Sequence, residues 1–425
     1  MRRKLIFWQS LTIALLFAGY AGYYLCRSDF SVTLPQLIDE FVSRGMTPEA
    51  AKIRLGQIGS WGVFAYAIGK LVLGGTADLL GGRRNFLAGM GGAILFTVLF
   101  GLGGGLPIFT LAWIGNRLLQ SIGWAGMVKI SSKWFSYAAY GTAMGVISLS
   151  YLFGDAASRY FMGALIHFGL GWRGVFLTAA GTLAVLFLAN LLLLKESREQ
   201  IGLPPAEVNP ANLFAAEDAP ARPRRMTEIL KPLLRSFAFW LVCLLSLGTT
   251  LVRETFNTWT PTYFNQALGI GKADAASLSA LFPLFGGFAV LLAGVLSDRI
   301  GRSGRASIMF YGLLLTSAAL AGLGLLPDGA AKAIPVSLVA LIGFLVIGPY
   351  SYLAGAIALD FGGRDGSATA SGLIDGVGYL GGGVLAGDTM ARVSVGFGWQ
   401  GAFLSLAAVA ALSSVAAFLF LRRQR

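Results

Sequence analysis

The sequence predicts an all-α membrane protein with twelve transmembrane helices in two pseudo-symmetric six-helix bundles. Its 425 residues are 56% hydrophobic and only 12% charged, with a mean hydropathy of +0.70. This composition is too apolar for a soluble globule. Long apolar runs separated by short polar stretches, and motifs that recur with a period near 226 residues, predict the helices and their arrangement in two halves.

Each apolar run is long enough to cross a bilayer as a helix, which takes about 20 residues. The runs lie at residues 5–26, 57–79, 86–105, 108–128, 140–165, 173–194, 236–264, 277–297, 306–325, 334–358, 367–390 and 398–421. The 58 glycines suit close helix packing in lipid. The first run continues to about Ile38, so we expect its helix to tilt or bend near Pro35.

Three pairs of stretches indicate an internal repeat. An arginine followed by phenylalanine three residues later and proline eight residues later occurs at 27–35 and again at 253–261. The stretch 171–177 recurs at 398–404, and an aspartate before a basic loop, Asp78, recurs as Asp298. We therefore expect a first bundle at 1–195, a polar proline-rich cytoplasmic linker at 196–235 and a second bundle at 236–425. Asp78 and Asp298 are predicted to have gating or structural roles.

The basic residues are distributed on one side of the predicted membrane spans. The net charge is +13, and most of the basic residues fall in alternate loops, in the linker and at both ends of the chain. The positive-inside rule then predicts that both termini are cytoplasmic in a multi-pass protein of the cell inner (plasma) membrane. This distribution argues against nucleic-acid binding, despite the high charge.

Two arginines inside predicted spans, Arg27 and Arg253, mark the candidate site. An intramembrane arginine costs roughly 3 kcal/mol on insertion scales and stays protonated. Two at equivalent repeat positions predict an anion site between the halves. Tyr20 and Tyr24 share a helical face with Arg27, which favours a cavity, although interface packing is an alternative. We expect the adjacent Glu254 to point away from Arg253.

Further ionisable residues lie inside predicted spans. Lys70 either lines the cavity or extends to the surface. Asp375 and Asp155 are each either a proton site or the partner of a basic residue. The two cysteines are isolated and there is one histidine, so the sequence predicts no metal site, no cofactor and no enzymatic activity.

Residues 23–30, which read Tyr-Tyr-Leu-Cys-Arg-Ser-Asp-Phe, resemble a motif in the first helix of the organophosphate:phosphate antiporters of the major facilitator superfamily. The Gly-Leu-Pro-Pro at 202–205 and the stretch 378–382 extend this resemblance over nearly the whole chain. The resemblance implies a major facilitator fold. It also implies that Arg27 and Arg253 grip a phosphate group, with Lys70, Tyr20, Tyr24 and Tyr379 lining the cavity.

The sequence departs from the family pattern at several positions. Ser28 and Asp29 replace Lys-Asn, Thr250 stands where a tyrosine is expected, and Gly154 aligns with a cavity histidine of the bacterial glycerol-3-phosphate antiporters. These departures concern the organic part of the substrate more than its phosphate.

The resemblance implies a transporter that acts as a monomer and exchanges a phosphorylated organic anion, such as a sugar phosphate or glycerol-3-phosphate, for inorganic phosphate by alternating access. One alternative is a proton-coupled organic-anion symporter of the same superfamily, with Asp155 or Asp375 as its proton site. Another alternative is a sugar-phosphate sensor, because the family includes membrane receptors for these compounds.

Overall fold

The computed structural model describes residues 2–73, 76–206, 226–300, 304–327, 329–353 and 357–424. Regular secondary structure in these residues is helical, and every predicted apolar run lies on a helix or a succession of helices. Helices satisfy their backbone N–H and C=O groups internally, and this is necessary because lipid tails offer these groups no hydrogen-bond partners. Eight described helices are long and apolar enough to cross a membrane. The expected all-helical membrane fold is therefore confirmed.

The chain forms two compact units. Unit 1 contains Met1–Thr33 and Ala65–Asp218, and unit 2 contains Leu34–Phe64 and Ala219–Arg425. Two boundaries fall inside the helices α1 (Arg2–Ser43) and α2 (Pro48–Leu73). Residues 34–43 of α1 and 48–64 of α2 thus belong to unit 2. The predicted division at the linker 196–235 stays a prediction, because residues 207–225 lie outside the described part.

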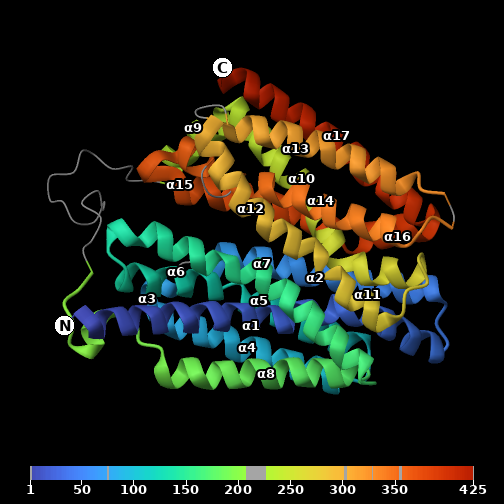
Figure 1. Ribbon diagram of the computed structural model, residues 1–425, viewed down its shortest axis with the longest axis horizontal. Coiled ribbons are helices and arrows are strands. Elements are labelled where there is room, and N and C mark those ends of the chain that lie inside the picture. Colours follow the sequence, from blue (N-terminus) through green and yellow to red (C-terminus); the bar gives the residue numbers. More distant parts are fainter. Residues whose placement is uncertain are drawn as a thin grey trace. The chain divides into compact units, whose positions relative to one another are not determined.

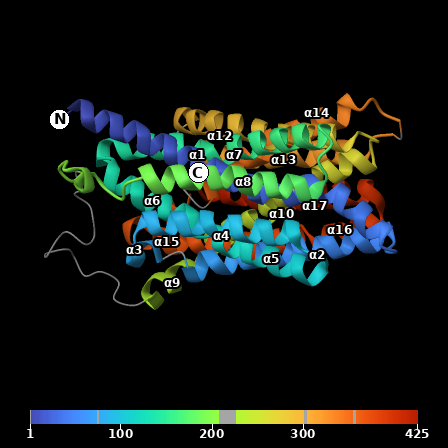
Figure 2. The same ribbon diagram turned by 90° about the horizontal axis from the view of Figure 1, so that it is seen from below.

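Unit 1 is built around α4, which packs against α5, α6 and α8; α4 and α8 run side by side in Figure 1, and α4 and α5 in Figure 2. Besides residues 2–33 of α1 and 65–73 of α2, its helices are α3 (Thr76–Leu80), α4 (Gly82–Leu102), α5 (Leu106–Gln120), α6 (Gly123–Trp134), α7 (Tyr137–His167), α8 (Trp172–Leu193) and the 3-10 helix η1 (Arg198–Ile201). Phe100 stacks on Phe109 and Phe176, with ring centroids 4.6 and 4.5 Å apart. These aromatic contacts fasten α4, α5 and α8 together at one end.

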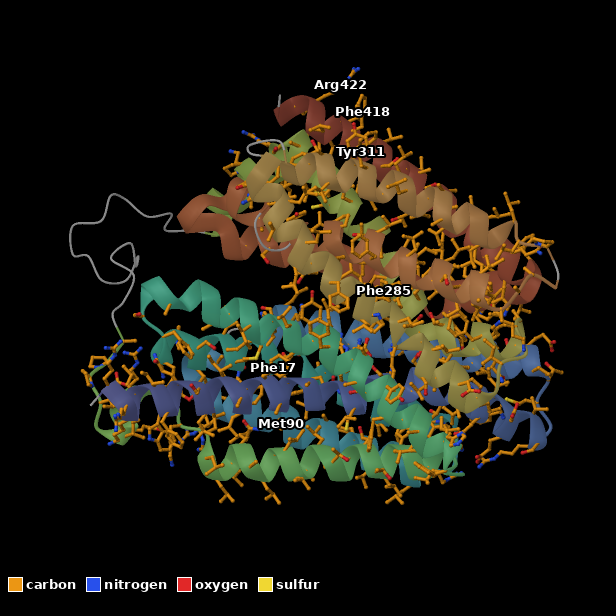
Figure 3. All side chains as sticks on the ribbon, in the orientation of Figure 1. Phe17, Met90, Phe285, Tyr311, Phe418 and Arg422 are labelled. Carbon is orange, nitrogen blue, oxygen red and sulfur yellow. The ribbon has the colours of Figure 1, made fainter. Side chains whose placement is uncertain are left out.

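In unit 2, α13 packs along α17, and α10 packs against both α17 and a π-helical segment. The helices are α9 (Met226–Arg235), α10 (Phe237–Gln266), α11 (Lys272–Ser279), α12 (Leu281–Ile300), α13 (Gly304–Gly324), α14 (Ala333–Tyr352), α15 (Ala358–Val377), the π-helix η3 (Gly378–Gly383), α16 (Asp388–Gly396) and α17 (Gly398–Gln424). Tyr311 is 59% exposed, and the Arg422 guanidinium lies over the Phe418 ring (Figure 3). Such an outer face suits contact with lipid.

Residues 34–64 are held to the rest of unit 2 by polar contacts. Ser60 donates a hydrogen bond of 2.5 Å to the Val384 carbonyl and accepts one of 2.8 Å from the Asp388 amide. The Lys52 ammonium lies 3.9 Å from the centroid of the Trp399 ring. These contacts explain why this segment groups with unit 2.

Candidate functional site

A break in α1 directly precedes Arg27. Cys26 has the non-helical angles φ −91° and ψ 18°. Its carbonyl accepts a hydrogen bond of 2.8 Å from Gln120 Nε2 of α5, while the Phe30 amide donates to Asp29 Oδ1 at 2.7 Å. In a regular helix the Cys26 carbonyl and the Phe30 amide would bond to each other. Side chains satisfy both groups instead, so α1 breaks at Cys26. The tilt or bend expected near Pro35, which lies within α1, stays a prediction.

Three cations of unit 1 gather around the ring of Tyr66, which is 3% exposed. The guanidinium carbons of Arg27 and Arg117 lie 4.5 and 4.9 Å from its centroid, and the Lys70 ammonium lies 5.3 Å away. Arg27 also donates a hydrogen bond to the Tyr66 side chain and lies 5.2 Å from the Tyr24 ring centroid. The ring faces thus hold positive charges close together inside the bundle.

The predicted tyrosines of α1 have different surroundings. Tyr24 lies beside Arg27, whereas Tyr20 packs among rings, with centroids 6.1 Å from Tyr24 and 5.4 Å from Trp124. Tyr20 therefore contacts the cationic cluster through Tyr24. Its own surroundings also fit the alternative of aromatic packing.

Sequence reasoning missed Arg117. It lies in α5, is 3% exposed, and its guanidinium carbon is 5.9 Å from the Trp113 ring centroid as well as close to Tyr66. The available signal was its place within the apolar run 108–128. The rule that singled out Arg27, that an intramembrane arginine marks a functional site, applies equally to Arg117.

Asp155 forms a buried charge pair with Arg159. It accepts a hydrogen bond of 2.8 Å from Arg159 Nε, one turn later on α7, and one of 2.5 Å from Ser28 Oγ of α1. The Arg159 and Asp155 side chains are 2% and 6% exposed. Because Arg159 and Ser28 both donate to Asp155 Oδ1, the geometry favours the charge-pair interpretation over a proton site.

The second predicted arginine, Arg253, lies in α10 of unit 2. It donates hydrogen bonds of 2.7 Å to the Tyr379 hydroxyl and 2.6 Å to Glu254 Oε1, and its guanidinium carbon lies 4.1 Å from the Tyr350 ring centroid. The expectation that Glu254 points away from Arg253 is therefore wrong. Both side chains are long enough to meet beside the helix, although the residues are adjacent in the sequence.

The π-helix η3 (Gly378–Gly383) presents Tyr379 to Arg253. Its approach to α10 is very close, since a Cβ at Gly382 would overlap the backbone oxygen of Leu247. Segments of π-helix are uncommon and occur often at functional sites. Glycine at this position lets the two helices come near enough for the hydrogen bond between Tyr379 and Arg253.

Asp375 lies one turn before Tyr379, on α15. It interacts electrostatically with Tyr350, which in turn hydrogen-bonds Tyr379. Asp375 is thus connected to Arg253 through two tyrosines. Sequence reasoning missed Tyr350, although it directly follows the Gly-Pro pair at 348–349 that belongs to the family resemblance.

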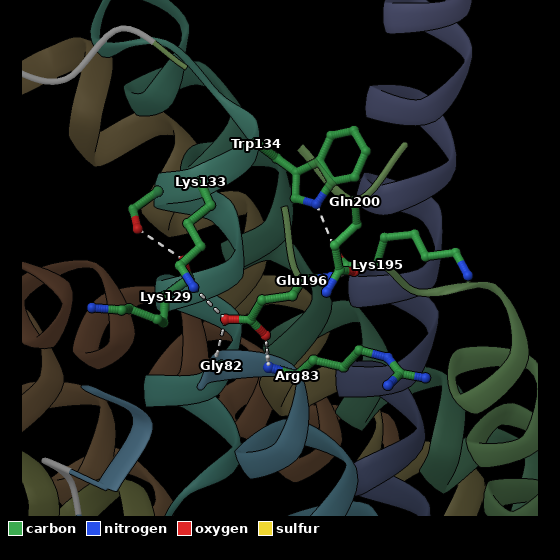
Figure 4. Close-up of polar contacts among 9 residues, drawn as sticks. Gly82, Arg83, Lys129, Lys133, Trp134, Lys195, Glu196 and Gln200 are labelled. Carbon is green, nitrogen blue, oxygen red and sulfur yellow. Dashed lines mark hydrogen bonds and ion pairs between the residues drawn. The ribbon is translucent and has the colours of Figure 1, made fainter. Parts of the chain in front are cut away.

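Asp78 and Asp298 were predicted to have gating or structural roles. Their side chains lie outside the described part of the structure. The helix α4 begins shortly after Asp78 in the chain, and Glu196 binds its N-terminus (Figure 4). It accepts hydrogen bonds of 2.6 Å from the Arg83 amide, 3.0 Å from the Gly82 amide and 2.6 Å from Lys133 Nζ. The carboxylate therefore complements the positive end of the helix dipole.

The same contacts set the pKa of Glu196, which lies outside the membrane-spanning segments. Burial raises this pKa, but the hydrogen bonds from Lys133 and the two amides outweigh burial and lower it below the ordinary value. Beside it, the Trp134 indole donates a hydrogen bond of 2.9 Å to the Lys195 carbonyl (Figure 4). Glu196 thus joins the segment after α8 to the start of α4 and to Lys133 at the end of α6.

The helical bundles and their buried charges define a multi-pass membrane protein with charged sites inside its helices. The chain belongs to the Major Facilitator Superfamily, whose model matches residues 13–386. It is therefore a member of a transporter family and not of an enzyme family.

Curated relatives cover nearly the whole chain. The chain is 28% identical to a probable hexose phosphate transport protein of Chlamydia pneumoniae, over 99% of this chain and 92% of the relative. It is 26% identical to a glycerol-3-phosphate transporter of Bacillus subtilis strain 168, over 92% and 87%. It is also 26% identical to the membrane sensor protein UhpC of Salmonella typhimurium, over 98% and 92%. The chain is thus related to the hexose-phosphate and glycerol-3-phosphate transporters, as its motifs indicated.

Solved structures confirm the fold. A bacterial homologue of the human lysosomal transporter Spinster, in an inward-facing and unoccupied conformation, matches with a TM-score of 0.77, and 98% of each chain is covered. A transporter of the POT family matches with a TM-score of 0.70, over 97% of this chain and 96% of the other. The identities are 15% and 14%, so the likeness concerns the fold alone.

Proposed function

We propose that the protein is a secondary active transporter that exchanges a phosphorylated organic anion for inorganic phosphate by alternating access. In this proposal the phosphate-binding residues are Arg27, Lys70 and Tyr24 of unit 1, and Arg253 and Tyr379 of unit 2. Tyr20 packs against the Tyr24 ring and helps to hold it in position. The protein is proposed to act as a monomer.

The observation that carries the proposal is the gathering of Arg27, Lys70 and Arg117 around one buried ring, Tyr66. Like charges in a medium of low dielectric repel strongly, and each arginine inside a membrane helix is itself costly. A bound anion offsets both the repulsion between the cations and the cost of placing them inside the membrane. Guanidinium groups suit phosphate in particular, because their planar fork donates two parallel hydrogen bonds to its oxygens.

The same electrostatics support exchange over free movement of the empty carrier. A site that closes without an anion would bury its cations uncompensated, whereas a phosphate or an organic phosphate compensates them. The empty transporter should therefore reorient slowly. The names of the relatives from Chlamydia pneumoniae and Bacillus subtilis support phosphorylated sugars or glycerol-3-phosphate as the organic substrates.

Counterflow into proteoliposomes tests this function. Vesicles loaded with phosphate should take up labelled phosphate, and external glycerol-3-phosphate or a hexose phosphate should compete for this uptake and drive release of the internal phosphate. Vesicles without internal phosphate should take up little. Equal uptake by loaded and empty vesicles would contradict obligatory exchange.

The proposed location is the cell inner membrane, with both termini in the cytoplasm. This orientation is supported by the basic loops. Cysteines introduced near Gly45 and Pro327 should react with an impermeant thiol reagent added outside intact cells, and a cysteine near Pro220 should not. Labelling of the Pro220 position from outside would reverse the proposed orientation.

Two alternatives have specific support. Asp375, through its interaction with Tyr350, is the carboxylate that a proton-coupled symporter could use. The likeness to the sensor protein UhpC favours a receptor that binds a sugar phosphate without carrying it. Exchange that collapses an imposed proton gradient would support the symporter, and tight binding without counterflow would support the sensor.

A further inference from the structure

Arg27 extends from a turn of α1 that lacks the regular helical hydrogen bond. Directly before it, Cys26 has non-helical backbone angles, and its carbonyl accepts a hydrogen bond of 2.8 Å from Gln120 of α5. The Phe30 amide donates to Asp29 Oδ1 instead of to that carbonyl. In a regular helix the backbone hydrogen bonds fix the direction of each side chain. On this turn the direction of Arg27 therefore depends on contacts that other side chains make.

The contact before Arg27 belongs to a chain of hydrogen bonds between three helices. Gln120 Nε2 also donates to Asn116 Oδ1 at 2.7 Å, and Asn116 Nδ2 donates to Thr97 Oγ1 of α4 at 2.9 Å. The side chains of this chain are buried. The backbone of α1 on the N-terminal side of Arg27 is thus held by α5, which is itself held by α4.

The contact after Arg27 comes from α7. Ser28 Oγ donates a hydrogen bond of 2.5 Å to Asp155 Oδ1, and the same oxygen accepts one of 2.8 Å from Arg159 Nε. Asp155 is therefore held on its own helix while it holds Ser28. Because all three side chains are buried, bulk water cannot take the place of a lost partner. The backbone of α1 on the C-terminal side of Arg27 is thus held by α7.

We propose that Ser28 and Asp155 are positioning residues of the anion site in unit 1. Their hydrogen bond fixes the turn from which Arg27 extends, and so holds its guanidinium carbon 4.5 Å from the centroid of the Tyr66 ring. Arg27 is partly exposed, whereas Ser28 is buried, so a ligand can reach the guanidinium but not the contact that orients it. The inference rests on the proposed function and adds the source of the orientation of Arg27.

Orientation matters because of the way a guanidinium binds phosphate. Its planar fork donates two parallel hydrogen bonds, and both form only when the plane of the fork faces the phosphate oxygens. Binding groups keep such a geometry when neighbouring hydrogen bonds restrict their movement. Loss of the bond between Ser28 and Asp155 should therefore weaken phosphate binding even though neither residue touches the ligand.

Ser28→Ala tests the inference through the KM and the maximal rate of phosphate–phosphate exchange in proteoliposomes. The variant should insert, because Asp155 keeps its ion pair with Arg159. Its KM should rise about tenfold, the effect of one lost hydrogen bond to a charged group, and its maximal rate should change much less. Ser28→Thr keeps a hydroxyl and should have a KM nearer the parental value. Ser131→Ala is the matched control, since Ser131 is equally buried and donates to the Met127 carbonyl of its own helix, α6.

A second set of variants tests whether Ser28 acts through Arg27. In the Arg27→Lys protein the fork is absent, so adding Ser28→Ala should change the KM by no more than about twofold, the limit expected for independent sites. A serine that only stabilises the bundle would have the same effect in both backgrounds. Lower expression alone would reduce the maximal rate and leave the KM unchanged.

The acceptor is tested by combining Asp155→Leu with Arg159→Met. This double variant removes both members of the buried ion pair, so it leaves neither of their charges without the other. Its KM should rise as in Ser28→Ala, and adding Ser28→Ala should change it by no more than about twofold. If the double variant does not insert, Ser28→Ala in the parental and Arg27→Lys backgrounds decides.

The inference and the proposed function fail differently. If the parental protein exchanges phosphate and Ser28→Ala has the parental KM, or raises the KM equally in both backgrounds, the inference is wrong and the proposed function stands. A well-inserted parental protein that neither exchanges nor binds phosphate would overturn the proposed function and the inference with it.

Discussion

Arg253 donates a hydrogen bond of 2.7 Å to the Tyr379 hydroxyl and thereby joins α10 to the π-helix η3. The same guanidinium also bonds Glu254 at 2.6 Å and lies over the Tyr350 ring. Arg253 is therefore held in place before any ligand arrives. Such preorganisation lowers the entropy that binding must remove.

The first prediction concerns Tyr379. Tyr379→Phe keeps the ring and removes the hydroxyl that accepts from Arg253, so one charge-assisted hydrogen bond is lost. Its loss costs roughly 1.5 kcal/mol, and the apparent affinity for phosphate in the exchange assay should fall about tenfold. Tyr263→Phe is the control, because Tyr263 packs against Trp399 and Phe403 in the same unit. Parental affinity in Tyr379→Phe would remove Tyr379 from the proposed site.

The second prediction concerns the break in α1. Gln120→Leu leaves the buried Cys26 carbonyl without the side chain that donates to it, and an unsatisfied buried group costs about 1–3 kcal/mol. The thermal unfolding midpoint in detergent should fall. Gln57→Leu should change it little, since Gln57 accepts only from the exposed Arg54 among the described contacts. An unchanged midpoint in Gln120→Leu would show that the break does not depend on Gln120.

These two sites illustrate what the sequence could and could not predict. Apolar run length determines where helices lie, because lipid leaves the backbone few other ways to satisfy its hydrogen bonds. The repeat located Arg27 and Arg253. The break at Cys26 has no local signal in proline or glycine, since it depends on Gln120, which is 94 residues away in the chain.

The sequence also did not predict which side chains contact one another. Arg253 and Glu254 meet because of the rotamers that the tertiary structure selects, which helical periodicity does not determine. Arg117 was visible as an intramembrane arginine, but its position against Tyr66 depends on how α5 is rotated in unit 1. Sequence patterns thus predict which residues are unusual, and packing determines which of them meet.

The third prediction follows from the lowered pKa of Glu196. The folded state favours the ionised carboxylate, so its contribution to stability is present above the ordinary glutamate pKa, about 4.3, and is lost as pH falls through the lower pKa of the folded state. Glu196→Gln should therefore lower the thermal midpoint at neutral pH. The difference from the parent should shrink as the pH falls below the ordinary glutamate value.

The matched control for this pH dependence is Glu199→Gln. Glu199 is nearby but exposed, and solvent screens its interactions, so its substitution should change the midpoint much less. A difference between Glu196→Gln and the parent that stays constant from neutral to acidic pH would show that ionisation of Glu196 is not the cause.

The fourth prediction concerns coupling to protons. If Asp375 only supports Tyr350 and Arg253, Asp375→Asn should weaken phosphate binding and leave the pH dependence of exchange in place. The measurement is the initial rate of phosphate exchange across the range from pH 6 to about pH 8, in which phosphate monoesters reach their second ionisation. If a normally expressed Asp375→Asn protein lost a proton-driven component of phosphate transport, this result would instead favour the symporter.

The fifth prediction concerns the two arginines that define the proposed site. Arg27→Lys and Arg253→Lys keep the positive charge and remove the planar fork that suits phosphate. The loss of one charge-assisted bidentate contact costs about 1.5–3 kcal/mol, so phosphate affinity should fall tenfold or more in each variant. Phosphate–phosphate exchange is the appropriate assay, because it requires no knowledge of the organic substrate.

Arg173→Lys is the control for these substitutions, since Arg173 interacts with Trp172 and the Gly103 carbonyl, outside the cluster around Tyr66. It should exchange phosphate at the parental rate. Both site variants should insert normally, because the charge is conserved at positions that the helices already accommodate. If Arg27→Lys and Arg253→Lys, properly inserted, both retain the parental rate and affinity, phosphate is not held by these arginines, and the intramembrane acidic residues become the better candidates.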